Sequence, residues 1–420
     1  MLRVELLTIG DELLLGYTVD TNAAHLARAL AEVGIVVSRR ATVADDAQEI
    51  ASAVREALDR TGAVITTGGL GPTADDRTRP AIAALFGRAL HRDDAIVATI
   101  EAQFRAMGYA AMPPANVTQA MVPEGARLLE NRHGTAPGLW LEDDAGRFVA
   151  MLPGVPREMR GMLADVLLPL LRERAGAGGS SGAVVLSRTV RTTGIGESAL
   201  AERLGELAGG VDGLPLAFLP GWEGVDLRLT VRGADRAAAE RALDAAAAKL
   251  RERAARWVYG EGAADLAAVV LQLCRERAAR LATAESCTGG LLGGRLTAIS
   301  GASDVYLGGV VAYDNAVKER LLGVPAALLR EHGAVSEAVA VAMARGACDA
   351  TGATVSMAIT GVAGPGGGTP EKPVGTVWLA AHALGETRAV RRVLPGDREE
   401  IRRRATQGAL DLVRRALQGV

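Results

Sequence analysis

The chain has 420 residues, of which 49% are hydrophobic and 23% are charged, a balance typical of folded proteins rather than disordered chains. At about 150 residues per domain, this length predicts two to three domains. The net charge of −2 provides no basic field for a nucleic-acid partner. Three cysteines do not make a disulfide framework. Charged residues interrupt every apolar run and no leader pattern is present, so we expect a cytoplasmic protein without membrane contact.

Strand and helix patterns alternate through the first 175 residues. Apolar strands are predicted at 4–10, 35–43 and 63–69. Such alternation favours a parallel sheet covered by helices on both faces. Segment 174–183 is rich in glycine and serine and is the clearest linker. The expected helices begin at Thr21 or Asn22, after Asp45 or Asp46, after Asp75, and near 93–107 and 156–174.

The remainder divides into a small module and a third unit. Residues 184–258 read as a compact α+β module with few chemical groups, which we interpret as a connector. From 261 onward, a helix precedes a strand at 280–286, a glycine-rich turn and a further helix. Strands are also predicted at 304–313, 353–360 and 375–383, and the arginines of the last helix, 397–417, indicate a solvated face.

A glycine-rich turn follows the strand at 63–69. Its glycines allow a ligand to approach the backbone, and a helix N-terminus behind it favours phosphate. Asp75 and Asp76 would repel phosphate, so a bridging divalent metal ion is the natural resolution. The alternative interpretation is a strand–helix turn with ordinary N-cap aspartates.

Four ordered segments of the N-terminal part, 9–22, 66–76, 131–138 and 152–159, resemble the competence/damage-inducible CinA family. The resemblance implies a three-layer molybdopterin-binding-like domain and metal-dependent hydrolysis of ADP-ribose to AMP and ribose 5-phosphate, with Asp76 and Asp75 on the metal. The same fold also serves plain binders. The residues that it places around the nucleotide and its pyrophosphate are Asp11, Glu12, Asn22, Gly69, Gly71, Pro72, Thr73, Gly134 and Thr135.

A second group of chemical residues lies in the C-terminal unit. Ser286 follows a strand, where sites of α/β sheets gather. Thr288, Gly289 and Gly290 can present N–H groups as an oxyanion hole or phosphate cradle. No histidine lies in a nucleophile motif, so a serine–lysine arrangement with Lys318 as base remains.

Each of these residues also has a structural interpretation. Ser286 could be a helix N-cap and Lys318 a surface charge. Cys287 is a competing nucleophile without an evident activator. Tyr313, at the end of another apolar strand, could relay the proton or orient the amine of Lys318.

Segments 284–297, 306–324 and 358–380 resemble the C-terminal domain of the CinA family, the nicotinamide mononucleotide (NMN) deamidases. This implies hydrolysis of NMN to nicotinic acid mononucleotide and ammonia without a cofactor, with Ser286 as nucleophile, Lys318 as base and Tyr313 as its partner. Thr360, Gly361 and the glycine loop 364–368 would contact substrate. Relatives often have serine where Asp314 stands, and its carboxylate could raise the pKa of Lys318.

The expected fold class is therefore α/β throughout. It comprises a three-layer molybdopterin-binding-like domain at 1–175, a small α+β connector at 183–260 and an α/β deamidase domain at 261–420. The resemblance also implies a homo-oligomer, a dimer in the first instance. Acidic balance and few aromatic residues predict no direct nucleic-acid binding. The alternative function is a nucleotide- or pterin-binding regulator with one or both sites non-catalytic.

Overall fold

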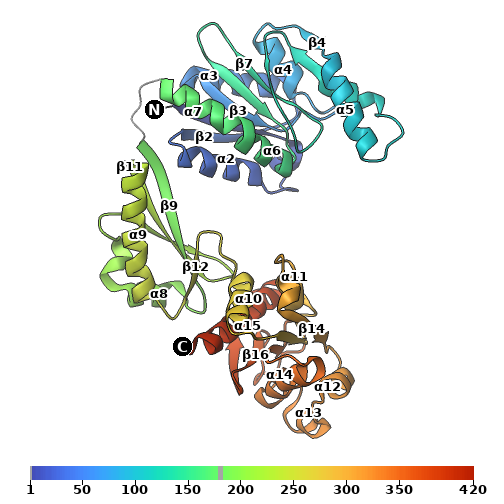
Figure 1. Ribbon diagram of the computed structural model, residues 1–420, viewed down its shortest axis with the longest axis vertical. Helices are drawn as coiled ribbons and strands as arrows, with labels where there is room; N and C mark the ends of the chain where they lie inside the picture. The colour runs from blue at the N-terminus through green and yellow to red at the C-terminus, as the bar shows by residue number, and fades with distance from the viewer. Residues whose placement is uncertain (1, 178–182) are drawn as a thin grey trace. The chain divides into compact units, whose positions relative to one another are not determined.

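The computed structural model describes residues 2–177 and 183–420 (Figure 1). Contacts divide the chain into two compact units: Met1–Leu186 with Val231–Glu240, and Ser187–Thr230 with Arg241–Val420. Within the described ranges, no helix is both long and apolar enough to cross a membrane. The predicted linker at 174–183 includes 178–182, which lie outside the described residues.

The N-terminal domain is a six-stranded sheet in the order β2-β1-β3-β8-β7-β6, with helices on both faces (Figure 1). Its strands are β1 (Arg3–Ile9), β2 (Val36–Val43), β3 (Ala63–Thr67), β6 (Arg127–Leu129), β7 (Gly138–Glu142) and β8 (Phe148–Leu152), with a separate pair β4 (Leu90–Arg92) and β5 (Met121–Pro123). Its helices are α1 (Asp11–Leu14), α2 (Thr21–Glu32), α3 (Ala47–Thr61), α4 (Thr78–Leu85), α5 (Asp94–Ala106), α6 (Pro156–Met162) and α7 (Leu168–Ala177).

Alternating side chains of the strands build two cores, one on each face of this sheet. Leu7 and Ile9 of β1 pack with α3 residues such as Ile50, whereas Leu6 packs with Leu26 of α2 on the other face. This period-two alternation within an almost wholly apolar strand is what a sheet covered on both sides requires. The three-layer architecture expected from the sequence is confirmed.

One expectation for this sheet needs correction, because it is mixed and not parallel throughout. β2, β1, β3 and β8 run parallel, but β7 is antiparallel to β8 and β6 is antiparallel to β7. The segment between β7 and β8 is a tight turn in which the Asp143 carboxylate accepts hydrogen bonds from the N–H groups of Ala145 and Arg147. A connection this short cannot make the crossover that a parallel pair needs.

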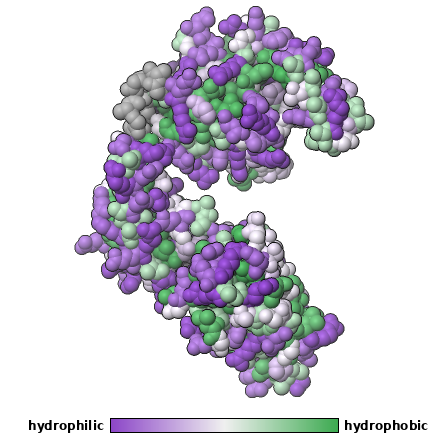
Figure 2. Space-filling model, viewed as in Figure 1, coloured by the Kyte–Doolittle hydropathy of each residue, from purple (hydrophilic) through white to green (hydrophobic). Residues whose placement is uncertain are grey.

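The middle module is a four-stranded sheet in the order β10-β11-β9-β12 with two α-helices. Figure 2 shows mostly hydrophilic residues on the visible face of this module. The α+β pattern and the long alanine-rich helix agree with the sequence analysis. The elements are β9 (Ala183–Thr192), α8 (Glu197–Leu204), β10 (Leu216–Pro220), β11 (Val225–Asp235), α9 (Arg236–Arg253) and β12 (Val258–Glu261).

The C-terminal domain is a five-stranded sheet in the order β14-β13-β15-β16-β17. β14, β13 and β15 are parallel, and β16 and β17 continue the sheet antiparallel. The strands are β13 (Leu281–Glu285), β14 (Tyr306–Val311), β15 (Val355–Gly361), β16 (Thr376–Ala383) and β17 (Glu386–Val393). The helices are α10 (Leu266–Glu276), α11 (Leu291–Thr297), α12 (Asn315–Leu322), α13 (Ala326–His332), α14 (Glu337–Thr351) and α15 (Arg398–Gln418).

Two hydrophobic cores sandwich this second sheet as well. Met357 and Ile359 of β15 pack toward α10 and α15, whereas Ala358 faces α14. Because β14, β13 and β15 are parallel neighbours, their carboxyl ends meet at one edge of the sheet. That edge carries the residues that follow each strand, including Ser286 after β13.

Candidate active sites

The glycine-rich turn after β3 is held in shape by Asp76. One carboxylate oxygen of Asp76 accepts the N–H of Gly71 at 2.7 Å, and the other accepts the N–H of Thr73 at 2.8 Å and the Thr73 hydroxyl. Gly69 has φ +65°, and a Cβ added there would lie 2.1 Å from the hydroxyl of Thr78. The turn therefore requires glycine at position 69.

A buried arginine donates hydrogen bonds to the backbone of this turn and of a neighbouring segment. It was not among the residues predicted from the sequence. Arg79, on α4, is 3% exposed and donates hydrogen bonds to the carbonyls of Thr118 and Leu70 at 2.7 and 3.1 Å. Burial lowers the pKa of Arg79 to about 10, while the charge of Asp76 acts in the opposite direction. α4 begins at Thr78 with Arg77 as its N-cap residue, so the N-cap interpretation of Asp75 and Asp76 is wrong.

A pocket of about 420 Å³ lies over the turn. Several carboxylates lie close together here. Burial raises the pKa of Asp45, and the negative charges of Asp11, Glu12 and Asp75 raise it further. Asp45 was not among the predicted site residues, although it lies two residues after the end of β2. The site residues predicted from the sequence that line this pocket are Glu12, Gly69, Gly71, Pro72, Asp75, Asp76 and Thr135.

The other predicted residues of this domain lie around the pocket. Asn22 lines a neighbouring pocket that shares Glu12, and its side-chain N–H₂ donates to the carbonyl of Gly154 at 2.7 Å. Asp11 and Asp45 exchange hydrogen bonds between backbone N–H and carboxylate at 3.0 and 3.3 Å. The N–H and hydroxyl of Thr73 donate to Asp76 and so stabilise the turn. Gly134 lines a separate pocket together with Thr135.

The carboxylates of Glu12, Asp45, Asp75 and Asp76 line this pocket, and carboxylate oxygens are the ligands that hard divalent cations take. Among the described residues, no group of three or more His, Cys, Asp or Glu side chains is arranged to cage a metal. Mg²⁺ is commonly held by one or two carboxylates together with water and substrate phosphates. Asp75 and Asp45 have the chemistry for that role, and metal binding by Asp75 and Asp76 stays a prediction.

In the C-terminal domain, a buried carboxylate organises the turn that carries Ser286. Glu285, the last residue of β13, is 2% exposed. Its carboxylate accepts N–H groups of Gly290 at 3.1 Å, Leu292 at 3.0 Å and Gly293 at 2.8 Å. The negative charge therefore sits at the positive N-terminus of α11, where the helix dipole stabilises it. Glu285 was not among the residues predicted from the sequence.

Two of the three expected oxyanion-hole groups are already satisfied inside this turn. The N–H of Gly289 donates to the carbonyl of Ser286 at 3.1 Å, and that of Gly290 donates to Glu285. This differs from the expectation that both face a ligand. Thr288 retains an unused polar group: its hydroxyl is buried and has no hydrogen-bond partner within the described part of the chain. The N-cap residue of α11 is Gly290, so Ser286 is not the helix cap.

Lys318 is buried at the same edge of the sheet. Its side chain is 1% exposed, and the Nζ donates to the backbone carbonyl of Tyr313 at 3.1 Å. Burial lowers the pKa of Lys318, and this outweighs the opposite effects of Asp314 and Cys287. Asp314 also caps α12 by accepting the N–H of Ala316. The surface-charge interpretation of Lys318 is therefore wrong.

Tyr313 contacts Lys318 through its main chain rather than its phenol. The side chain of Tyr313 is 62% exposed, and its hydroxyl accepts a hydrogen bond from Arg398 at 3.2 Å. Arg398 also donates to the carbonyl of Gly364 in the glycine loop. Arg402, one turn further along α15, donates to the carbonyl of Thr288 at 2.7 Å. The two arginines place positive charge near Cys287, the residue after Ser286, and neither was predicted from the sequence.

The remaining predicted residues have structural partners in this domain. The hydroxyl of Thr360 donates to the carbonyl of Ala334 at 2.8 Å. A Cβ added at Gly361 would lie 2.7 Å from Val377. Burial raises the pKa of Cys287 to about 11, so the thiol stays protonated near neutral pH and is a poor nucleophile.

The fold and sites define a chain with a molybdopterin-binding-like N-terminal domain and a separate α/β domain at its C-terminus. Family models match in this order: "Probable molybdopterin binding domain" at 5–173, "Damage-inducible protein CinA KH domain" at 187–260 and "CinA C-terminal domain" at 263–417. A CinA-like protein of Gemmatimonas aurantiaca is 62% identical over 98% of this chain and 96% of its own. The chain belongs to the CinA family.

Other proteins similar to this chain cover all or part of it. A CinA-like protein of Salinibacter ruber is 45% identical over 99% of this chain and all of its own length (100%). A crystal structure of CinA from Thermoplasma acidophilum, described as of unknown function, is 38% identical. It covers 40% of this chain and 97% of its own, with a TM-score of 0.37.

Proposed function

We propose that the C-terminal domain deamidates NMN to nicotinic acid mononucleotide and ammonia. The observation that carries this proposal is the buried Lys318, whose pKa is lowered by burial and which lies within electrostatic reach of Cys287, the residue after Ser286. A lowered pKa makes the neutral amine easier to reach, and a neutral amine can act as a general base, which arginine cannot do. Ser286 itself is 9% exposed at the end of β13.

In the proposed reaction, the Ser286 hydroxyl oxygen attacks the carboxamide carbon of NMN while Lys318 accepts the hydroxyl proton. The tetrahedral intermediate then collapses, the C–N bond breaks, and the proton from Lys318 goes to the leaving nitrogen to form ammonia. Water attacks the resulting ester, which releases nicotinic acid mononucleotide and restores the serine. The backbone carbonyl of Tyr313 holds the amine of Lys318 in place.

The surrounding groups supply substrate binding. Arg398 and Arg402 are suited to the phosphate of NMN because guanidinium groups bind phosphate with paired hydrogen bonds. The unpartnered hydroxyl of Thr288 is available to a substrate oxygen. The experiment is ammonia release from NMN, in which Ser286→Ala should be inactive and Cys287→Ala should remain active.

For the N-terminal domain, we propose metal-dependent hydrolysis of ADP-ribose to AMP and ribose 5-phosphate. The acidic pocket over a glycine turn supports it, because a cation is needed between the carboxylates and a pyrophosphate. Asp75 and Asp45 would hold the ion, Asp76 would keep the turn in shape, and the bound metal would neutralise charge on the pyrophosphate. The dimer implied by the family resemblance stays a prediction.

The experiment for this domain measures two activities on one preparation. Asp76→Asn should reduce AMP production from ADP-ribose, because an amide nitrogen would face the N–H of Gly71 or Thr73 and open the turn. Ammonia release from NMN should persist, since the two sites lie in different compact units. Unchanged AMP production would contradict the role of this turn, and loss of both activities would indicate unfolding.

A further inference from the structure

A cavity of about 600 Å³ lies between the middle module and the C-terminal domain, away from the deamidase site. All residues that line it belong to one compact unit, Ser187–Thr230 with Arg241–Val420. One wall consists of the loops 193–197 and 220–225 of the middle module, and the other of α15 and the residues next to it, including Leu379, Arg392 and Leu394. Small-molecule sites are concave, commonly measure about 300–1,000 Å³ and occur preferentially at domain interfaces.

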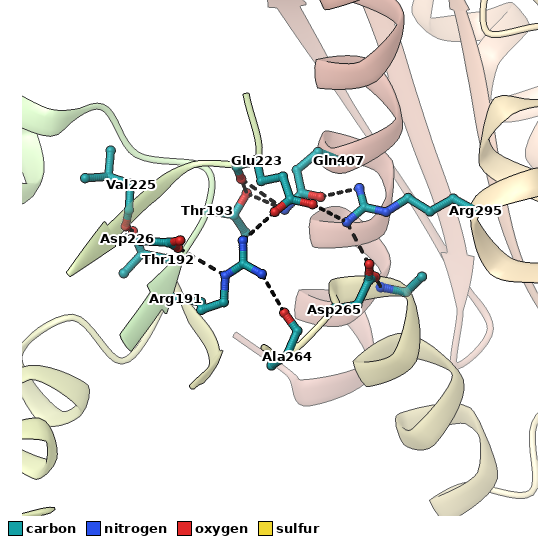
Figure 3. A network of polar contacts seen from close by, with 11 residues as sticks. Arg191, Thr192, Thr193, Glu223, Val225, Asp226, Ala264, Asp265, Arg295 and Gln407 are labelled. Atoms are coloured by element: carbon teal, nitrogen blue, oxygen red, sulfur yellow. Dashed lines mark hydrogen bonds and ion pairs between the residues drawn. The ribbon is translucent and has the colours of Figure 1, made fainter. Parts of the chain in front are cut away.

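A network of polar contacts fixes the two walls relative to each other (Figure 3). Arg295 of α11 donates to Gln407 of α15 at 2.6 Å and to Glu223 of the middle module at 3.0 Å. Gln407 in turn donates to Thr193 at 3.2 Å and to the carbonyl of Glu223 at 3.0 Å. Buried charge-assisted contacts of this kind hold a site in one geometry before a ligand arrives.

The cavity contains two arginines that lack acidic partners. Neither Arg392 nor Arg404 forms an ion pair with any residue that the structure describes, and the Nε of Arg404 is buried without a hydrogen-bond partner. The lining carboxylates are largely committed elsewhere: Glu223 bonds to Arg295, and Glu400 accepts the N–H of Asp397 in the capping box of α15. Glu197, the third lining carboxylate, is exposed.

An unsatisfied buried guanidinium donor is costly, and an anionic ligand would satisfy it. Other lining residues are apolar and include Ile195, Leu379, Leu394 and Trp222, whose ring lies under the guanidinium of Arg295. The cavity thus combines two guanidinium groups that lack acidic partners with an apolar wall. This combination suits a molecule that has a phosphate at one end and a flat ring at the other.

We propose that this cavity binds a small phosphorylated organic molecule of mononucleotide size, with Arg392 and Arg404 contacting its phosphate. This site lies outside both proposed active sites. It also gives the middle module a binding role besides that of a connector, since loops 193–197 and 220–225 form half of the cavity.

The test uses the full-length chain with AMP, adenosine and inorganic phosphate as probes. In wild-type protein, AMP should slow amide hydrogen exchange in peptides that cover 193–197 and 220–225, and it should bind more tightly than either fragment. Arg392→Gln/Arg404→Gln should weaken this binding by about a hundredfold, roughly tenfold for each charge-assisted contact. Arg388→Gln is the matched control, because Arg388 lies on the same strand, exposed and paired with Glu386.

Circular dichroism and the thermal midpoint of each variant establish that the chain is folded. The exchange experiment on wild-type protein also stands without any variant. Protection confined to 66–76 or 286–290 would overturn the proposal, because AMP would then occupy only the proposed active sites. AMP binding at the loops that is unchanged in the double variant would overturn it as well.

Discussion

Replacing Glu285 by glutamine should loosen the turn that presents Ser286. The carboxylate accepts three backbone N–H groups, two on one oxygen and one on the other. Glutamine keeps one acceptor oxygen and turns its N–H₂ group toward at least one buried N–H. Hydrogen bonds to a charged group contribute about 1.5–3 kcal/mol each, and a buried unsatisfied donor costs about 1–3 kcal/mol. We therefore expect local stability to fall by about 3–4 kcal/mol.

The assay is amide hydrogen exchange of the peptide that covers 286–297 in the full-length chain. A loss of this size corresponds to roughly 10²–10³-fold faster exchange of the protected N–H groups. Glu319→Gln is the control, since Glu319 is exposed on the nearby helix α12. Exchange of this peptide within about twofold of wild type in Glu285→Gln would refute the reasoning, because the three hydrogen bonds would then contribute little.

Two further predictions concern the glycine turn and the buried lysine. Gly69→Ala should lower the thermal midpoint of the N-terminal domain more than Gly87→Ala. The two residues have φ +65° and +64°, but a Cβ added at Gly69 would lie 2.1 Å from the Thr78 hydroxyl, whereas one added at Gly87 would meet nothing within 4 Å; equal losses would contradict the close contact. Burial lowers the pKa of Lys318, so kcat/KM for NMN should rise with pH through that lowered pKa. Lys318→Arg should cost about 10²–10⁴-fold in activity, and near-normal turnover in it would contradict the role as base.

Local sequence patterns were enough to predict most elements near the sites. The almost wholly apolar β1 and the amphipathic α2 carry clear periodicities, and Asp46 caps α3 as expected. The strand Phe148–Leu152 was missed although all five of its residues are buried. A short apolar run without alternation does not distinguish a central strand from a buried helical segment.

The site chemistry was predictable only in part because several key contacts are long-range. Ser286 and Lys318 were candidates from the sequence, but the burial that lowers the pKa of Lys318 depends on tertiary packing, in which α12 lies against α14. Arg398 meets Tyr313 across 85 positions of the chain, and no local pattern indicates such a contact. The phenol of Tyr313, expected at the amine, instead faces Arg398 while the main-chain carbonyl holds Lys318.

The most direct measurement of the central claim is the rate of ammonia release from NMN by the wild-type chain, Ser286→Ala and Cys287→Ala, each shown to be folded. The account predicts turnover by the wild type, none above background in Ser286→Ala, and a rate close to wild type in Cys287→Ala. Wild-type-like turnover in Ser286→Ala, or its loss only in Cys287→Ala, would contradict a serine nucleophile. Absence of ammonia release from the folded wild-type chain would contradict the deamidase function itself.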